Sequence, residues 1–254
     1  RYLFRDARGW PRLHTAQWND DVHHALHLLA TGERHGYYVS YADDPLRHLA
    51  RCLAEGFAFQ GEQLPYTGEA RGEPSGGLPP EAFLGFLQNH DQVGNRAFGE
   101  RLVALAPPGK LRPLTAVLLL APQPPMLFQG EEWGASTPFL YFCDFGPELA
   151  AAVRDGRRRE FARFPEFADP ATRDRIPDPN DAATFARSKL DWTEREREPH
   201  AQWLSLYREC LRLRREHVVP LLADGIAEAT VKRPSPGELR VDWRSRSGGT
   251  LTLL

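Results

Sequence analysis

The stretch Phe-Leu-Gly-Phe-Leu-Gln-Asn-His-Asp-Gln at residues 83–92 decides the fold class. Its first five residues are apolar on both faces, which is typical of a strand buried on both sides in a parallel sheet. The run ends abruptly in polar residues that include His90 and Asp91. In parallel α/β folds, ligands and catalytic groups collect at the carboxyl ends of the strands. We therefore predict an α/β protein with a functional site directly after this strand.

A second apolar run followed by a polar, acid-bearing segment occurs further along the chain. Residues 126–128 are Met-Leu-Phe, and the polar segment Gln-Gly-Glu-Glu-Trp-Gly follows at 129–134. Two apolar runs that both end in acid-bearing segments indicate two parallel strands that contribute to one edge of a sheet.

Helical patterns surround these runs, as repeated β-α units require. Asn19 suits the N-cap of a helix over 21–31 that Gly32 would end, and Asp44 with Pro45 opens a second helix. Further helices are predicted over 96–105, 111–121, 147–160 and 200–217, strands over 13–18 and 37–41, and an irregular loop over 61–80. After Gly225 the periodicity changes towards two, which predicts the start of an all-β domain. The chain begins with Arg1 and stops inside this strand pattern, so we expect a piece of a longer protein.

Composition excludes several classes of function. The 254 residues hold 32 basic and 34 acidic side chains, a net charge of −2, which argues against nucleic acid or an anionic membrane as partner. No apolar run approaches the roughly 18 residues that a membrane helix needs. The three unpatterned cysteines form no disulfide framework, so a reducing cytoplasm is the expected location. Without a glycine-rich phosphate loop we expect no cofactor, and the basic runs at 157–159 and 212–215 are expected on solvated helix faces.

His90 and Asp91 are the first candidate site. A carboxylate and an imidazole side by side can each hydrogen-bond a hydroxyl of one sugar ring, and the carboxylate can stabilise positive charge that develops nearby. The alternative is structural: Asp91 would cap the next helix and His90 would be a satisfied core histidine.

The segment Asp20, Asp21, Val22, His23 and His24 is the second candidate. His23 and His27 have the i, i+4 spacing of helical metal ligands, but a ligand bound through its hydroxyls is favoured over a metal. The acids could equally serve only to stabilise a helix N-terminus.

Glu131, Glu132 and Trp133 form the third candidate. An aromatic face can stack on a pyranose ring while acids accept from its hydroxyls. A solvated pair of glutamates is the alternative.

Residues 86–96 resemble the fourth signature region of the α-amylase family of glycoside hydrolases. The resemblance extends through 17–27, 31–38, 125–134 and 176–192, and so covers nearly all of the chain. Within the family, the blocks at 17–27 and 176–192 are similar to the trehalohydrolases that act on maltooligosyl trehalose.

This resemblance implies a partial (β/α)8 TIM barrel, about strands 6 to 8, over residues 1–222, and the beginning of a C-terminal β-sandwich over 223–254. It implies hydrolysis of the α-1,4 bond next to the trehalose end of maltooligosyl trehalose, with retention and without a cofactor or metal. Asp91 would be the catalytic transition-state stabiliser. The implied substrate-binding residues are Asp20, Asp21, Val22, His23, His24, His90, Gln92, Val93, Gly94, Asn95, Glu131 and Trp133.

The chain departs from the family pattern because barrel strands 1 to 5 are expected to precede it. The nucleophilic Asp and the acid/base Glu would lie there, so the fragment alone is expected to be inactive and marginally stable. A branching enzyme, a maltooligosyl trehalose synthase and a non-catalytic carbohydrate-binding piece are the alternatives.

Overall fold

A computed structural model describes residues 2–254. The chain forms two compact units. The first unit contains the residues up to Leu87 together with Ala106–Leu127 and Ser205–Leu254, and the second contains Gln88–Leu105 and Phe128–Leu204.

Capping residues begin the two N-terminal helices of the first unit. Helix α1 (Asp20–Thr31) starts after Asn19, whose side chain accepts a hydrogen bond from the Val22 amide, and it ends at Gly32, which has a φ of 79°. Helix α2 (Pro45–Glu55) starts after Asp44, which accepts from the Arg47 amide. Both predicted helices are confirmed.

The parallel strands are short. Strand β1 (Gln17–Trp18) pairs with β2 (Phe83–Leu84), and an isolated parallel bridge joins Gly85 to Pro125. Residues 126–128 therefore form no strand of their own, contrary to prediction. The pairing consists of two hydrogen bonds of Gly85, whose amide donates to the Pro124 carbonyl at 2.9 Å and whose carbonyl accepts from the Met126 amide at 2.7 Å.

Residues 37–41 were predicted as a strand, and this prediction is wrong. They lie in a 3-10 helix, Gly36–Tyr41. Its aromatic side chains pack on the histidines of α1; Tyr38 stacks on His27 with 4.2 Å between ring centroids. This packing outweighs the strand preference of the aromatic residues.

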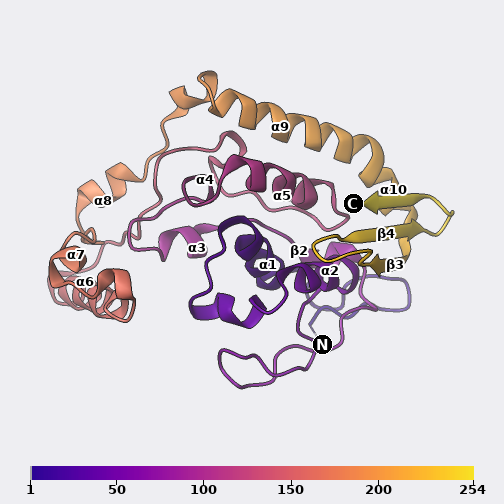
Figure 1. Ribbon diagram of the computed structural model, residues 1–254, viewed down its shortest axis with the longest axis horizontal. Coiled ribbons are helices and arrows are strands. Elements are labelled where there is room, and N and C mark those ends of the chain that lie inside the picture. The colour runs from indigo at the N-terminus through magenta and orange to yellow at the C-terminus, as the bar shows by residue number, and fades with distance from the viewer. Residues whose placement is uncertain (1) are drawn as a thin grey trace. The chain divides into compact units, whose positions relative to one another are not determined.

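The C-terminal strands form an antiparallel sheet in the order β3 (Ile226–Lys232), β4 (Arg240–Ser245) and β5 (Thr250–Leu253). β3 and β4 lie against α2 (Figure 1), and the Trp243 indole donates to the Leu53 carbonyl at 3.0 Å. The predicted change to strand periodicity is confirmed. The sheet lies in the same compact unit as α1 and α2, and a domain boundary at residue 222 stays a prediction.

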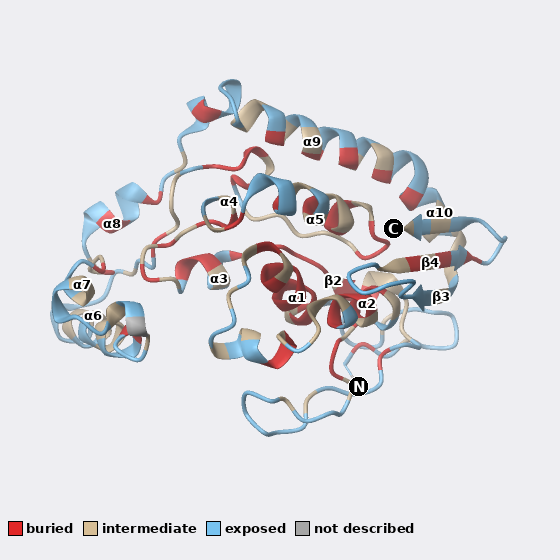
Figure 2. Cartoon of the chain, viewed as in Figure 1, coloured by how far each residue is buried: buried red, intermediate tan, exposed pale blue. Residues whose placement is uncertain are grey.

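The predicted helix over 200–217 changes type before its end. It is α-helical as α9 (His200–Leu213), becomes a π-helical turn over Arg214–Val218 and continues as α10 (Val219–Asp224). The buried residues Trp203, Tyr207 and Cys210 form one face of α9, seen as a row of red segments in Figure 2.

Arg214 is buried at this π-helical turn, contrary to the expected solvated face. Its guanidinium donates to the carbonyls of Leu119, Ala121, Pro122 and Gln123, where α5 (Pro108–Leu120) ends. Arginine thus satisfies carbonyl groups that have no partner within the helix.

The second unit is built from short helices joined by long loops. These are α3 (His90–Gly94), α4 (Leu102–Leu105), α6 (Pro147–Phe161), α7 (Pro170–Asp174) and α8 (Ala182–Arg187). Ala97, Phe161 and Ile176 form a core cluster, against which Phe98 and Phe167 pack. The predicted helix over 147–160 is confirmed, whereas that over 96–105 is limited to α4. Within residues 2–254, no helix combines the length and apolarity needed to cross a membrane.

Gly99→Ala is expected to destabilise the second unit by about 2–4 kcal/mol. Gly99 has a φ of 63°, and a Cβ there would lie 2.4 Å from the Phe139 carbonyl oxygen, so the substitution combines backbone strain with a clash against main chain. Denaturant unfolding measures the loss. The control Gly109→Ala, where a Cβ meets nothing within 4 Å, should not destabilise; equal losses for both variants would contradict this expectation.

Candidate functional site

Helix α3 presents His90 and Asp91 at its N-terminus. The preceding Asn89 is the cap: its side chain accepts from the Asp91 amide at 2.7 Å, and the Gln92 side chain accepts from the Asn89 amide at 3.1 Å. This reciprocal pair satisfies two backbone N–H groups that have no partner within the helix. The cap is therefore Asn89, and the structural alternative for Asp91 does not apply.

His90 and Asp91 themselves are open to solvent. Their side chains are 56% and 60% exposed, and His90 Nε2 lies 3.5 Å from an Asp91 carboxylate oxygen. His90 is therefore no core histidine. The pair offers a carboxylate and an imidazole side by side, both accessible from solvent.

Residues 92–95, which follow this pair, have different roles. Val93 is buried, and Gly94 lies against the Phe139 ring, 3.5 Å from where a Cβ would stand. Asn95 is exposed, and its amide donates to the Asp91 carbonyl at 3.0 Å. Gln92 serves the capping box. Of the predicted binding residues in this segment, His90, Asp91 and Asn95 have exposed side chains.

Asp21 is 1% exposed and is surrounded by donors of the first unit. Its carboxylate accepts from the Tyr41 hydroxyl at 2.7 Å, from the Ala58 amide at 2.8 Å and from the Phe59 amide at 3.3 Å, and it pairs with Arg71 at 3.0 Å. Burial and the Asp21 charge raise the pKa of Tyr41. These contacts give Asp21 a structural role, whereas its neighbour Asp20 is half-buried in the first turn of α1.

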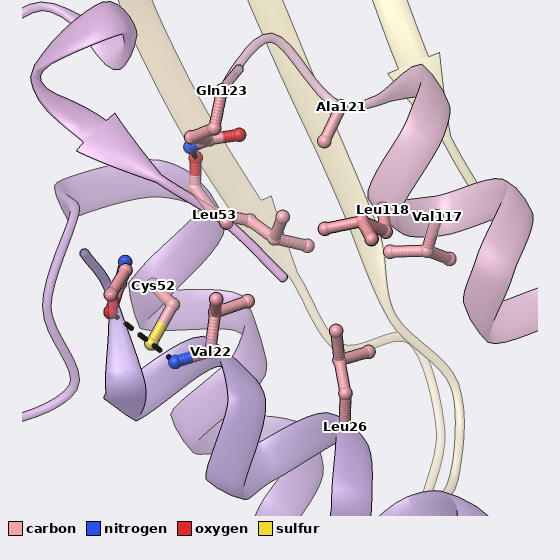
Figure 3. Close-up of a pocket in the computed structure, with 10 residues that line it drawn as sticks. Val22, Leu26, Cys52, Leu53, Val117, Leu118, Ala121 and Gln123 are labelled. Carbon is pink, nitrogen blue, oxygen red and sulfur yellow. Dashed lines mark hydrogen bonds between the residues drawn. The ribbon is translucent and has the colours of Figure 1, made fainter. Parts of the chain in front are cut away.

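Val22 lines a small apolar cavity between α1, α2 and α5 (Figure 3). The cavity volume is about 10 Å³, which is room for one water molecule at most. This space is a packing defect of the core and holds no ligand.

Three histidines of α1 lie in one buried cluster. His23 Nδ1 is 2.6 Å from the Leu87 carbonyl, so it must donate, and Nε2 then accepts from the Tyr38 hydroxyl at 3.1 Å. His27 is bonded to Glu33 at 2.8 Å. His24 Nδ1 is buried without a hydrogen-bond partner, and the ring packs on Tyr41 with 4.8 Å between centroids. In the described part of the chain, no group of His, Cys, Asp and Glu is arranged to hold a metal ion.

Burial keeps the imidazoles of His23 and His24 neutral. It lowers the pKa of His23 well below 6.5, and burial with the nearby Arg71 charge lowers the pKa of His24 to about 3. In the unfolded chain both rings take up a proton below about pH 6.5, so acid favours unfolding.

The first unit should therefore lose stability as the pH falls from 7 to 5, by about 2 kcal/mol for each of these histidines. Urea unfolding at several pH values measures the slope. His24→Phe should reduce the slope, while the control His217→Phe, at an exposed position, should leave it unchanged. A stability that does not change between pH 7 and 5 would contradict this prediction.

Glu131 and Trp133 are both buried in the second unit. Glu131 accepts from the Phe128 amide at 3.3 Å, and the Trp133 indole packs on Trp192 with 5.0 Å between centroids. Arg101 holds the same region by donating to the Gln129 and Thr137 carbonyls. The geometry thus gives Glu131 and Trp133 packing roles, since neither side chain is open to a sugar.

Comparison with known proteins relates the chain to one group of enzymes, although no family model matches it. It is 44% identical over 238 residues to a malto-oligosyltrehalose trehalohydrolase from Arthrobacter ramosus, covering 92% of this chain and 40% of the relative. A trehalohydrolase of the same name from Rhizobium sp. is 41% identical over 254 residues, covering 98% of this chain and 40% of the relative. The chain is similar in sequence to one part of the malto-oligosyltrehalose trehalohydrolases.

A solved structure agrees with this relationship. A Salmonella typhimurium protein described as an alpha amylase superposes with a TM-score of 0.90 and 50% identity, over 99% of this chain and 42% of that one. The fold thus matches that of one part of this Salmonella typhimurium protein. The chain spans about 40% of the length of the trehalohydrolases that it matches.

One contact to the candidate site was not predicted from the sequence. Arg157 lies in a run of three arginines expected to be solvated, yet its guanidinium donates to the carbonyls of Gly94 and Arg96, next to α3. Three consecutive arginines are typical of the exposed face of a surface helix, and no local signal distinguishes Arg157 from its neighbours.

Proposed function

We propose that this chain is part of a glycoside hydrolase that cleaves the α-1,4 bond next to the trehalose end of maltooligosyl trehalose and releases trehalose. The observation that carries the proposal is the exposed pair of His90 and Asp91 on a firmly capped helix. Relatives 41–44% identical to nearly all of the chain are named for this reaction.

Asp91 is proposed to stabilise the transition state. Cleavage of a glycosidic bond passes through an oxocarbenium-like state, in which positive charge develops on the sugar. A carboxylate beside that sugar lowers the energy of the charged state, and His90 can hold a neighbouring hydroxyl. Asn95 would contact the same ligand. Gln92, Val93, Gly94, Glu131 and Trp133 of the same unit would support the binding surface through packing.

The covalent steps of a retaining mechanism need a nucleophilic carboxylate and an acid/base carboxyl group. We propose that both lie outside the 40% of the trehalohydrolases that this chain matches, and that residues 1–222 represent about strands 6 to 8 of a barrel, with a β-domain from 223. None of the acids in the chain is assigned to either role.

The 254-residue chain alone is therefore expected to release no trehalose from maltotriosyl trehalose, whereas the full-length gene product should release it. Chromatography of the products measures both reactions. Trehalose release by the purified 254-residue chain would contradict the assignment of the covalent steps. A full-length product that yields no trehalose would contradict the proposed function.

An α-amylase that cuts internal α-1,4 bonds is a second candidate, because the Salmonella typhimurium protein is described as an alpha amylase and is 50% identical. The two activities differ in their products. An amylase forms reducing maltooligosaccharides from starch, while the proposed enzyme requires a trehalose end. Comparing both substrates with the same full-length protein separates the candidates.

A further inference from the structure

Helix α3 is too short to be stable by its own hydrogen bonds. It has five residues, and isolated helices shorter than about 12 residues are marginal in water. Its N-terminal amides are satisfied by the Asn89–Gln92 capping box, but its C-terminal carbonyls need partners from outside the helix. Since α3 carries His90 and Asp91, whatever holds its C-terminus also fixes that pair.

Arg157 of α6 supplies a partner for the last carbonyl of the helix and for one carbonyl just beyond it. Its Nη2 donates to the Gly94 carbonyl at 3.0 Å and to the Arg96 carbonyl at 2.7 Å. A cation at the C-terminal end of a helix also interacts favourably with the carbonyl dipoles there. The two ends of α3 are thus held in different ways, one by its own capping box and one by a distant arginine.

The guanidinium itself lies close to two aromatic rings. Its central carbon lies 4.8 Å from the ring centroid of Tyr141 and 5.2 Å from that of Phe161. Burial lowers the pKa of Arg157, which the nearby Glu160 and Tyr141 counteract, and arginine remains protonated in proteins. A planar cation in contact with two aromatic rings has less freedom to move than a solvated one.

We propose that Arg157 is a positioning residue for the His90–Asp91 pair. By holding the Gly94 and Arg96 carbonyls, it fixes the end of α3 and, through the bond from the Asn95 amide to the Asp91 carbonyl, the backbone of Asp91. The consequence for catalysis rests on the proposed function. Arg157 does not touch the substrate; it keeps the carboxylate where the developing charge will be.

Arg157→Gln in the full-length gene product tests the proposal. The loss should appear mainly in kcat for maltotriosyl trehalose, because Asp91 acts on the transition state, and we expect a decrease of about 10- to 100-fold. Arg157→Lys keeps the charge but not the planar fork, so it should recover part of the activity.

Arg158→Gln is the matched control. Arg158 lies on the same helix and contacts Asp174 instead, by a hydrogen bond to its carbonyl and an ion pair with its carboxylate. Its kcat should stay within about twofold of the wild type. Equal losses of kcat in the two variants would show that replacing either arginine lowers activity by destabilising the protein. That result would overturn the proposal.

A double-mutant cycle with Asp91→Asn separates positioning from general damage. If Arg157 acts through Asp91, Arg157→Gln should change kcat less than twofold in the Asp91→Asn background. If Arg157→Gln lowered kcat by the same factor in the Asp91→Asn background as in the wild type, the proposal would be overturned.

Hydrogen exchange provides a readout that does not depend on the reaction. Arg157→Gln should accelerate exchange of the amides in residues 93–97 at least tenfold, and Arg158→Gln should not. If the wild-type protein released no trehalose, the proposed function would fail, while this acceleration would still support positioning of α3. Unchanged exchange would overturn the positioning role whatever the activity.

Discussion

Asp91→Asn in the full-length gene product is expected to lower kcat for trehalose release by about 100- to 1,000-fold. The amide has nearly the same size as the carboxylate but no charge, so it cannot stabilise an oxocarbenium-like transition state. Removing one electrostatic contact to a transition state typically has an effect of this size. The measurement is kcat under saturating substrate, together with the midpoint of thermal unfolding.

The structure predicts that the fold survives this change. Asp91 is 60% exposed, and the capping of α3 depends on Asn89 and Gln92 instead. The matched control is Asp155→Asn, an exposed aspartate on α6, which should leave kcat unchanged. An Asp91→Asn protein that is equally active, or inactive only because it is unfolded, would contradict the proposed role.

Asp21→Ala is expected to destabilise the first unit by about 3–5 kcal/mol, since it leaves the buried partners of the carboxylate without an acceptor. The amides of Ala58 and Phe59 and the Tyr41 hydroxyl would each lose a hydrogen bond, and Arg71 would lose its ion pair. Urea unfolding of the full-length gene product measures the effect.

Asp20→Ala is the control for this prediction. The two aspartates are adjacent in the first turn of α1, but Asp20 is half-buried, so its loss should cost less than about 1 kcal/mol. If the two variants were equally stable, the buried network around Asp21 would not have the structural role assigned to it.

Local signals predicted the helix boundaries well. Asn19 and Asp44 begin the two helices that they were expected to begin, because a capping side chain acts on amides only two or three residues away. The conformation of residues 37–41 depends instead on the stacking of Tyr38 on His27, which a local pattern cannot reveal.

Local signals also predicted part of the candidate site. The position of His90 and Asp91 after a buried strand indicated their importance, and the structure adds that both are exposed. Asp20 and Asp21 look equivalent in sequence, yet the partners of Asp21 come from residues 41, 58, 59 and 71. The contact of Arg157 with Gly94 joins residues 63 positions apart, so no local rule could separate it from Arg158.

The hydrogen bonds from Arg214 to the carbonyls at the end of α5 have a consequence for biosynthesis. The carbonyls that it satisfies lie 91 to 95 residues earlier in the chain. At a synthesis rate of about 5–20 residues per second, a ribosome needs about 5–20 s to make the intervening segment. During that interval the junction after α5 must be solvated or held by a chaperone, because the side chain that will complete it has not yet been translated.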